Sequence, residues 1–182
     1  MRASICFSAL ALLLATPVAA QDGNPAGMEP GTDLNAADRV FAMAIAQGGM
    51  AEVKLGELAV KSGHGDTVKK FAKQMVSDHS KANDKFADVA KKQGLEPPKG
   101  IDPEHQAMTR KLQDLTGRRF DTEYMKGQVS DHQKTAQLLE YEMGSGQNTA
   151  VKDFASDALP TVLRHLKMAQ EVMGELTGQA VR

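Results

Sequence analysis

Apolar and polar positions along the chain follow a helical period from about residue 35 to residue 176. In the first stretch, small and apolar residues recur three or four positions apart, at Phe41, Ala44, Gly48, Ala51 and Leu55. This spacing places them on one face of an α-helix and predicts a long helix over about residues 35–62. No stretch alternates with a period of two over a useful length, so we expect no β-sheet.

Three more long stretches carry the same kind of stripe, over about residues 66–94, 121–143 and 148–176. A short helix is predicted over about residues 102–115. Asp102 and Asp121 stand where side-chain caps of helix N-termini are favoured. Pro160 lacks an amide hydrogen, so we expect a kink or a short break near Ala158. The pattern predicts an all-α fold with four long helices and one short helix.

Two of the long helices share a motif. Residues 73–83 read KQMVSDHSKAN, and residues 126–136 read KGQVSDHQKTA, 53 positions later. The copies align along their whole length only if the two helices run parallel. The connector of about 25 residues, with its short helix, is long enough to cross the bundle. We therefore predict a four-helix bundle of up-down-down-up order with one long crossover that contains the short helix.

The residues before the bundle have the features of an export signal. Arg2 is followed by an apolar run over residues 5–15 and by small residues at Val18, Ala19 and Ala20. We expect a signal peptide over residues 1–20, a flexible tether over 21–34, the bundle over 35–176 and a tail over 177–182. The apolar run is shorter than the ~20 residues that span a bilayer, so no membrane span is expected. Periplasmic or secreted localisation follows.

The composition of the chain excludes several classes of functional site. The single cysteine, Cys6, lies within the predicted signal peptide, which leaves the mature chain without disulfides or thiolate ligands. A formal charge of -1 and 4% aromatic residues argue against binding to nucleic acid. The chain has no phosphate-binding loop, dinucleotide fingerprint or His-Glu-x-x-His motif. We expect no catalytic residues, and the sequence defines neither a protein partner nor an oligomeric state.

Four polar residues occupy positions that face the predicted bundle axis. His79, His132 and His165 lie on the apolar stripes of three helices, and Glu52 lies on the small-residue face of the first. Imidazole and carboxylate together suit zinc, iron, copper or manganese, so these four residues are candidate metal ligands. His165 fits least well, because it lies about twenty residues beyond the second helix link while His132 lies about thirteen before it. The alternative is that the histidines are neutral core residues bonded to backbone, carboxylate or water and that no cofactor is bound.

The aspartates of the duplicated motif directly precede its histidines. Asp78 and Asp131 lie about 100° around the helix from His79 and His132, so each is poorly placed to bind the same ion as its neighbour. Surface ion pairs with nearby lysines are their expected use. Their repetition leaves open a role in contacts between helices.

The order of the motifs resembles the exported ferritin-like family of domain of unknown function 4142. The similarity rests on EVKLG at 52–56, VKKFA at 68–72, the two VSDH segments, FDTEY at 120–124 and LPTVLRH at 159–165. It implies a ferritin-like four-helix fold in the periplasm or outside the cell, with no established activity.

One feature of di-iron ferritin-like proteins is missing. Their Glu-x-x-His motif would require a glutamate three residues before each histidine, where Val76, Val129 and Val162 stand instead. A ferroxidase centre is therefore not expected. Two functions remain open: a non-enzymatic bundle that acts through its surface in the cell envelope or in stress survival, and a transition-metal or redox protein that uses its interior histidines.

Overall fold

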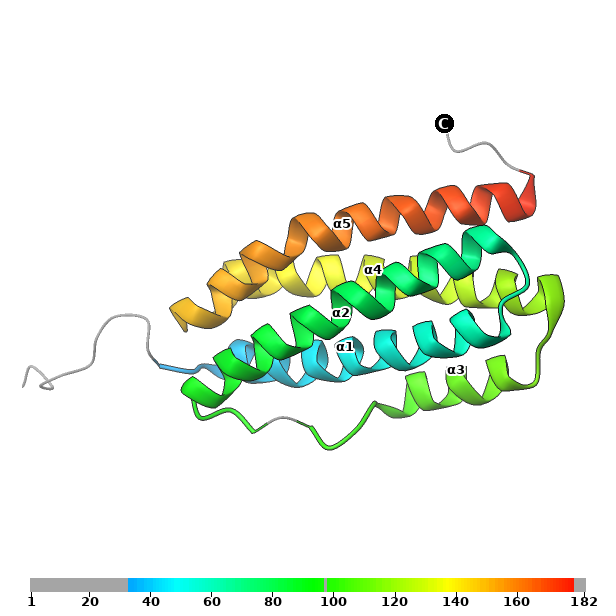
Figure 1. Cartoon of the computed structure of the whole chain (residues 1–182). Coiled ribbons are helices and arrows are strands. Elements are labelled where there is room, and N and C mark those ends of the chain that lie inside the picture. The colour runs from blue at the N-terminus through cyan, green and yellow to red at the C-terminus, as the bar shows by residue number, and fades with distance from the viewer. Residues whose placement is uncertain (1–32, 97, 179–182) are drawn as a thin grey trace, which may run out of the picture.

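The computed structural model describes residues 33–96 and 98–178 (Figure 1). This part of the chain forms α1 (Ala36–Ser62), α2 (Asp66–Lys92), α3 (Pro103–Gln113), α4 (Gly117–Ser145) and α5 (Thr149–Thr177). It contains no strand, so the predicted all-α class is confirmed. The predicted signal peptide, residues 21–32 of the tether and residues 179–182 of the tail lie outside the described residues. None of the described helices has the length and apolar character needed to cross a membrane.

Side-chain caps set several helix starts. The Asn35 side chain accepts a hydrogen bond from the Asp38 amide, and the Asp38 carboxylate accepts one from the Asn35 amide. Asn148 caps α5 through the Val151 amide. Asp102 caps α3 as predicted, with Pro103 in the first turn. Local sequence thus fixes where these three helices begin.

One local prediction is wrong, and a second is narrowed. α4 begins at Gly117, after Thr116, so Asp121 lies inside the helix and does not cap it. Its buried carboxylate instead accepts hydrogen bonds of 2.8 and 2.7 Å from the backbone amides of His64 and Gly65, in the link between α1 and α2. α5 continues through Pro160, so of the two expected outcomes the short break does not occur; one missing amide removes only one bond of a 29-residue helix.

Contacts at both ends of the molecule give the helix directions. At one end the start of α1 meets the link between α4 and α5, where the Asp38 carboxylate accepts from the amides of Gln147 and Asn148. Asn148 also donates to Gln93, just after α2. At the other end Arg118 donates to the Leu176 carbonyl. α2 and α4 therefore run parallel, and α1 and α5 run opposite to both, which is the order that the duplicated motif predicted (Figure 1).

α3 lies in the long crossover and packs along the outside of α1 and α4 (Figure 1). Leu112 is buried against the bundle, and Met108 packs beside it. The crossover is thus held to the bundle by an apolar contact.

The interior consists of two apolar clusters along the bundle axis. One includes Leu55, Phe71, Met75, Phe120 and Tyr124, and lies toward the link between α1 and α2. The other lies toward the link between α4 and α5, and its largest members are Phe41, Phe86, Leu139 and Phe154. Between them, at the middle of the four long helices, lie interior polar residues, which we call the polar layer: Glu52, His79, Gln128, His132 and His165. His79 is half-buried and the other four are buried.

Candidate metal centre

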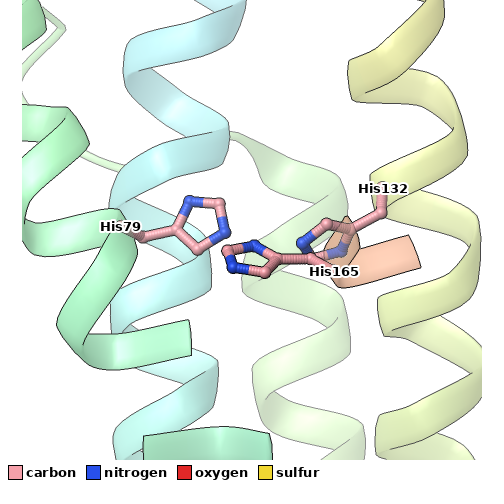
Figure 2. Close-up of side chains that lie close together, drawn as sticks. All are labelled: His79, His132 and His165. Atoms are coloured by element: carbon pink, nitrogen blue, oxygen red, sulfur yellow. The ribbon is translucent and has the colours of Figure 1, made fainter. Parts of the chain in front are cut away.

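The three histidines of the polar layer face one another across the bundle axis (Figure 2). Their ring centroids are 5.5 Å apart in all three pairs. One ring nitrogen from each residue lies within 4.8 Å of a nitrogen from the other two. We call this group the histidine trio. α2 supplies His79, α4 supplies His132 and α5 supplies His165.

Within the part of the chain that the structure describes, each ring of the trio has a buried nitrogen without a hydrogen-bond partner. These atoms are Nε2 of His79, Nε2 of His132 and Nδ1 of His165. Gln128 Oε1 is a fourth such atom in the polar layer. A buried polar atom left unpaired costs about 1 to 3 kcal/mol, so four in one layer form an unusual concentration.

The outer nitrogens of two rings are held by the protein. His132 Nδ1 donates to the Gln128 carbonyl at 2.9 Å, and His165 Nε2 donates to the Asp78 carboxylate at 2.9 Å. These bonds fix the proton on the outer nitrogen, so the inner nitrogen carries a lone pair directed at the trio. Backbone carbonyls and carboxylates hold metal-binding histidines in the same way.

The rings are neutral at neutral pH. Burial lowers the pKa of His79 to about 3, and the nearby His132 and His165 add to this effect. Burial also lowers the pKa of His132 and of His165, although the Gln128 carbonyl and the Asp78 carboxylate respectively oppose it. Neutral imidazole is the form that binds a metal ion, so the trio needs to release no proton.

Glu52 belongs to the polar layer but not to the trio. One carboxyl oxygen accepts a hydrogen bond of 2.8 Å from the side-chain amide of Gln128, and the other lies 3.8 Å from Nδ1 of His132. Burial raises the pKa of Glu52 to about 8, while the bond from Gln128 partly opposes this rise. Glu52 therefore faces the outer nitrogen of His132, away from the centre of the trio.

The structure joins His165 to the other two rings despite the unequal spacing expected from the sequence. α4 extends to Ser145 and α5 begins at Thr149, so His132 lies 13 residues before the end of its helix and His165 lies 16 after the start of its own. The difference of three residues is less than one helical turn. The expected mismatch was overestimated because the link was placed too early.

The aspartates of the duplicated motif each contact a histidine on another helix. Asp78 accepts from His165, and Asp131 Oδ2 lies 3.6 Å from Nε2 of His105 on α3. His105 also contacts Asp102, its own helix cap. Interaction with Asp131 raises the pKa of His105 to about 9, with Asp102 adding to the effect and burial opposing it. Sequence reasoning missed His105, and the only signal for it was the unexplained repetition of the aspartate.

A cavity of about 290 Å³ adjoins the trio. His79, His165 and Glu52 line it at the polar layer, and apolar atoms from all four long helices form most of its wall surface. The cavity extends only toward the cluster that contains Phe86 and Phe154. On the opposite side of the polar layer, Leu55 and Met75 belong to the other apolar cluster.

Comparison with known proteins identifies relatives by sequence and by fold. The family model described as domain of unknown function (DUF4142) matches residues 23–172. No curated protein matches the sequence.

Two solved structures share the fold. A DUF305 fragment from Deinococcus radiodurans has a TM-score of 0.69 and 15% sequence identity, covering 78% of this chain and 98% of that chain. A protein named "putative secreted protein DUF305" from Streptomyces coelicolor has a TM-score of 0.65 and 14% identity, covering 80% and 97%.

Proposed function

Because this chain belongs to the family of domain of unknown function 4142, which has no stated activity, we propose its function from its interior site: it binds one transition-metal ion through His79, His132 and His165. The observation that carries the proposal is a set of three neutral imidazoles, two buried and one half-buried, whose ring nitrogens come within 4.8 Å of one another. Each ring has a buried nitrogen without a hydrogen-bond partner among the described residues. An ion at the centre would give all three atoms a partner at once.

The donor set indicates the kind of ion. Three imidazoles without a thiolate suit zinc and copper, and they also bind cobalt and nickel. In tetrahedral zinc sites the nitrogens lie about 2.0–2.1 Å from the metal, so three of them stand about 3.4 Å apart. Small ring movements inward would bring the trio to this separation. Because three protein ligands leave a fourth position of a tetrahedral ion free, the site would be an open one.

The proposal includes the fold family and the cellular location. We propose that the four long helices form a ferritin-like bundle in which a three-histidine site replaces the carboxylate-bridged di-iron centre. We also propose export through the signal sequence of residues 1–20, which is supported by the name "putative secreted protein DUF305" of the structural neighbour from Streptomyces coelicolor. A metal-binding or redox role outside the cytoplasm follows, and no catalytic reaction is assigned to it.

Metal titration of the tag-free protein tests the proposal. After treatment with a chelator, the protein is titrated with Zn²⁺ and, under reducing conditions, with Cu⁺ in competition with a chromogenic chelator. We expect one ion per chain in the wild type and at least a hundredfold loss of affinity in His132→Ala. His64→Ala is the matched control, because His64 is an exposed histidine outside the site. Equal binding by wild type and His132→Ala, or absence of stoichiometric binding, would refute the proposed function.

A further inference from the structure

The cavity beside the trio is large enough to hold an organic molecule. Its volume of about 290 Å³ is nearly twice that of the engineered apolar cavity of about 150 Å³ that binds benzene. Its walls include the rings of Phe86 and Phe154, the side chain of Val162 and the small residues Gly48 and Ala82. These walls favour an apolar ligand body over a polar one.

The cavity lies on one side of the trio only. Apart from Asp78, its residues on α2 and α4 follow the histidines in sequence, and on α1 and α5 they precede Glu52 and His165. Because α2 and α4 run opposite to α1 and α5, all four sets lie on the same side of the polar layer. The opposite side contains the buried side chains of Leu55 and Met75. The free position of an ion held by three rings therefore has open space only toward the cavity.

The cavity also has a way out to solvent. Its exposed lining residues are Lys81 and Lys85 on α2 and Asp157 and Arg164 on α5, so its mouth lies between these two helices. The Lys85 ammonium and the Asp157 carboxylate pair across the mouth at 2.7 Å. An exposed ion pair of this kind contributes little stability, so opening it costs little.

We infer that this cavity is a ligand site, which takes a small molecule with an apolar body of one or two rings and one lone-pair donor that completes the coordination of the metal ion. The inference rests on the proposed function, because the donor needs an ion to bind. It adds a second component to the site, a pocket that selects what reaches the ion. The trio supplies three donors and the cavity determines the fourth.

The test uses 4-phenylimidazole and imidazole as probes on the Co²⁺-loaded protein. Both probes have the same donor, and only 4-phenylimidazole has an apolar body. The visible absorption bands of Co²⁺ change when its fourth ligand changes, so a titration gives the affinity of each probe. We expect 4-phenylimidazole to bind at least tenfold more tightly than imidazole in the wild-type protein, because its phenyl ring leaves water for the apolar walls.

A variant that fills the cavity tests its role directly. A Cβ atom at Gly48 would meet no atom within 4 Å, so Gly48→Leu adds a side chain at the cavity wall without a clash at its first atom. We expect this variant to lose at least tenfold in affinity for 4-phenylimidazole while its affinity for Co²⁺ is unchanged. The matched control is Gly144→Leu, at an exposed helical glycine that also has open space, and it should behave as wild type.

The outcomes separate the two proposals. Failure of the wild type to bind Co²⁺ would overturn the proposed function and this inference together. Stoichiometric Co²⁺ with equal affinity for the two probes would overturn this inference alone, and that comparison requires no variant. Equal weakening by Gly48→Leu and Gly144→Leu would also overturn it.

Discussion

Replacement of His79 by leucine separates a metal site from a structural polar layer. Nε2 of His79 is buried and has no hydrogen-bond partner among residues 33–96 and 98–178. The ring stays neutral at neutral pH because burial lowers its pKa to about 3. Leucine removes the unpaired atom and keeps an apolar side chain in the same space. In the metal-free protein, His79→Leu should therefore raise the free energy of unfolding by about 1 to 2 kcal/mol. This value lies in the lower part of the range of about 1 to 3 kcal/mol that an unpaired buried polar atom costs.

The order of stability of wild type and His79→Leu reverses when metal is present. An ion that binds only the folded state stabilises the wild type by about 2.7 kcal/mol when its free concentration is a hundred times the Kd. The variant has only two imidazoles and should gain little. Wild type should then be the more stable protein by about 1 kcal/mol, so the sign of the difference between the two proteins changes on loading.

Thermal and urea unfolding in chelator and in buffered Zn²⁺ measure this crossover. For a domain of this size, 1 kcal/mol corresponds to a change in Tm of about 2–4 °C. His64→Leu is the control, because it makes the same replacement at an exposed position and should show no dependence on metal. If His79→Leu destabilises the protein equally in chelator and in Zn²⁺, the ring is a satisfied core residue and the reasoning fails.

Three further predictions concern the frame around the site. Asp121→Ala should lower the free energy of unfolding by about 2 to 4 kcal/mol in urea, because it leaves two backbone amides without their carboxylate; no change would show that water replaces it. His105→Gln should destabilise most at low pH. The raised pKa of His105 contributes stability below pH 6.5 that is lost as pH rises through about 9. The difference in free energy of unfolding between wild type and His105→Gln, measured by urea titration, should therefore shrink by about 1 to 2 kcal/mol over that pH range. A difference that does not change with pH would contradict the raised pKa. Gly56→Ala should destabilise the protein by about 1 to 3 kcal/mol, because its Cβ would lie 2.8 Å from Val76. Gly48→Ala should stabilise it by up to about 1 kcal/mol, because a Cβ there meets no atom within 4 Å. Equal Tm values for the two variants would refute this packing argument.

The sequence alone predicted those features of the fold that depend on residues close together in the chain or on a motif that occurs twice. The apolar stripes predicted every long helix, Asp102 predicted its cap, and the duplicated motif predicted that α2 and α4 run parallel. These signals depend on neighbours within a few positions or on the comparison of two segments. They require no knowledge of how the helices pack.

The rest depends on contacts between residues far apart in the chain. Asp121 bonds to an amide 57 residues away, so its place near a helix start suggested a cap that it does not form. The contact between Asp131 and His105 joins two helices whose packing no local pattern specifies. The apolar stripes placed the three histidines on the bundle axis. To predict that they lie at the same level along this axis, the true ends of the helices had to be known. The cavity arises from small residues such as Gly48 and Ala82 on separate helices, and their combined space appears only after packing.

The origin of the three imidazoles has a consequence for the lifetime of a bound ion. His79 belongs to the pair formed by α1 and α2, and His132 and His165 belong to the pair formed by α4 and α5. Neither pair alone has three donors, so capture of an ion at this site follows the docking of the two halves of the chain. An ion held there could leave when the halves separate, or through the mouth of the cavity between α2 and α5. If the proposed ion binds, its residence time would therefore depend on motion of the bundle and on small molecules that compete for the ion.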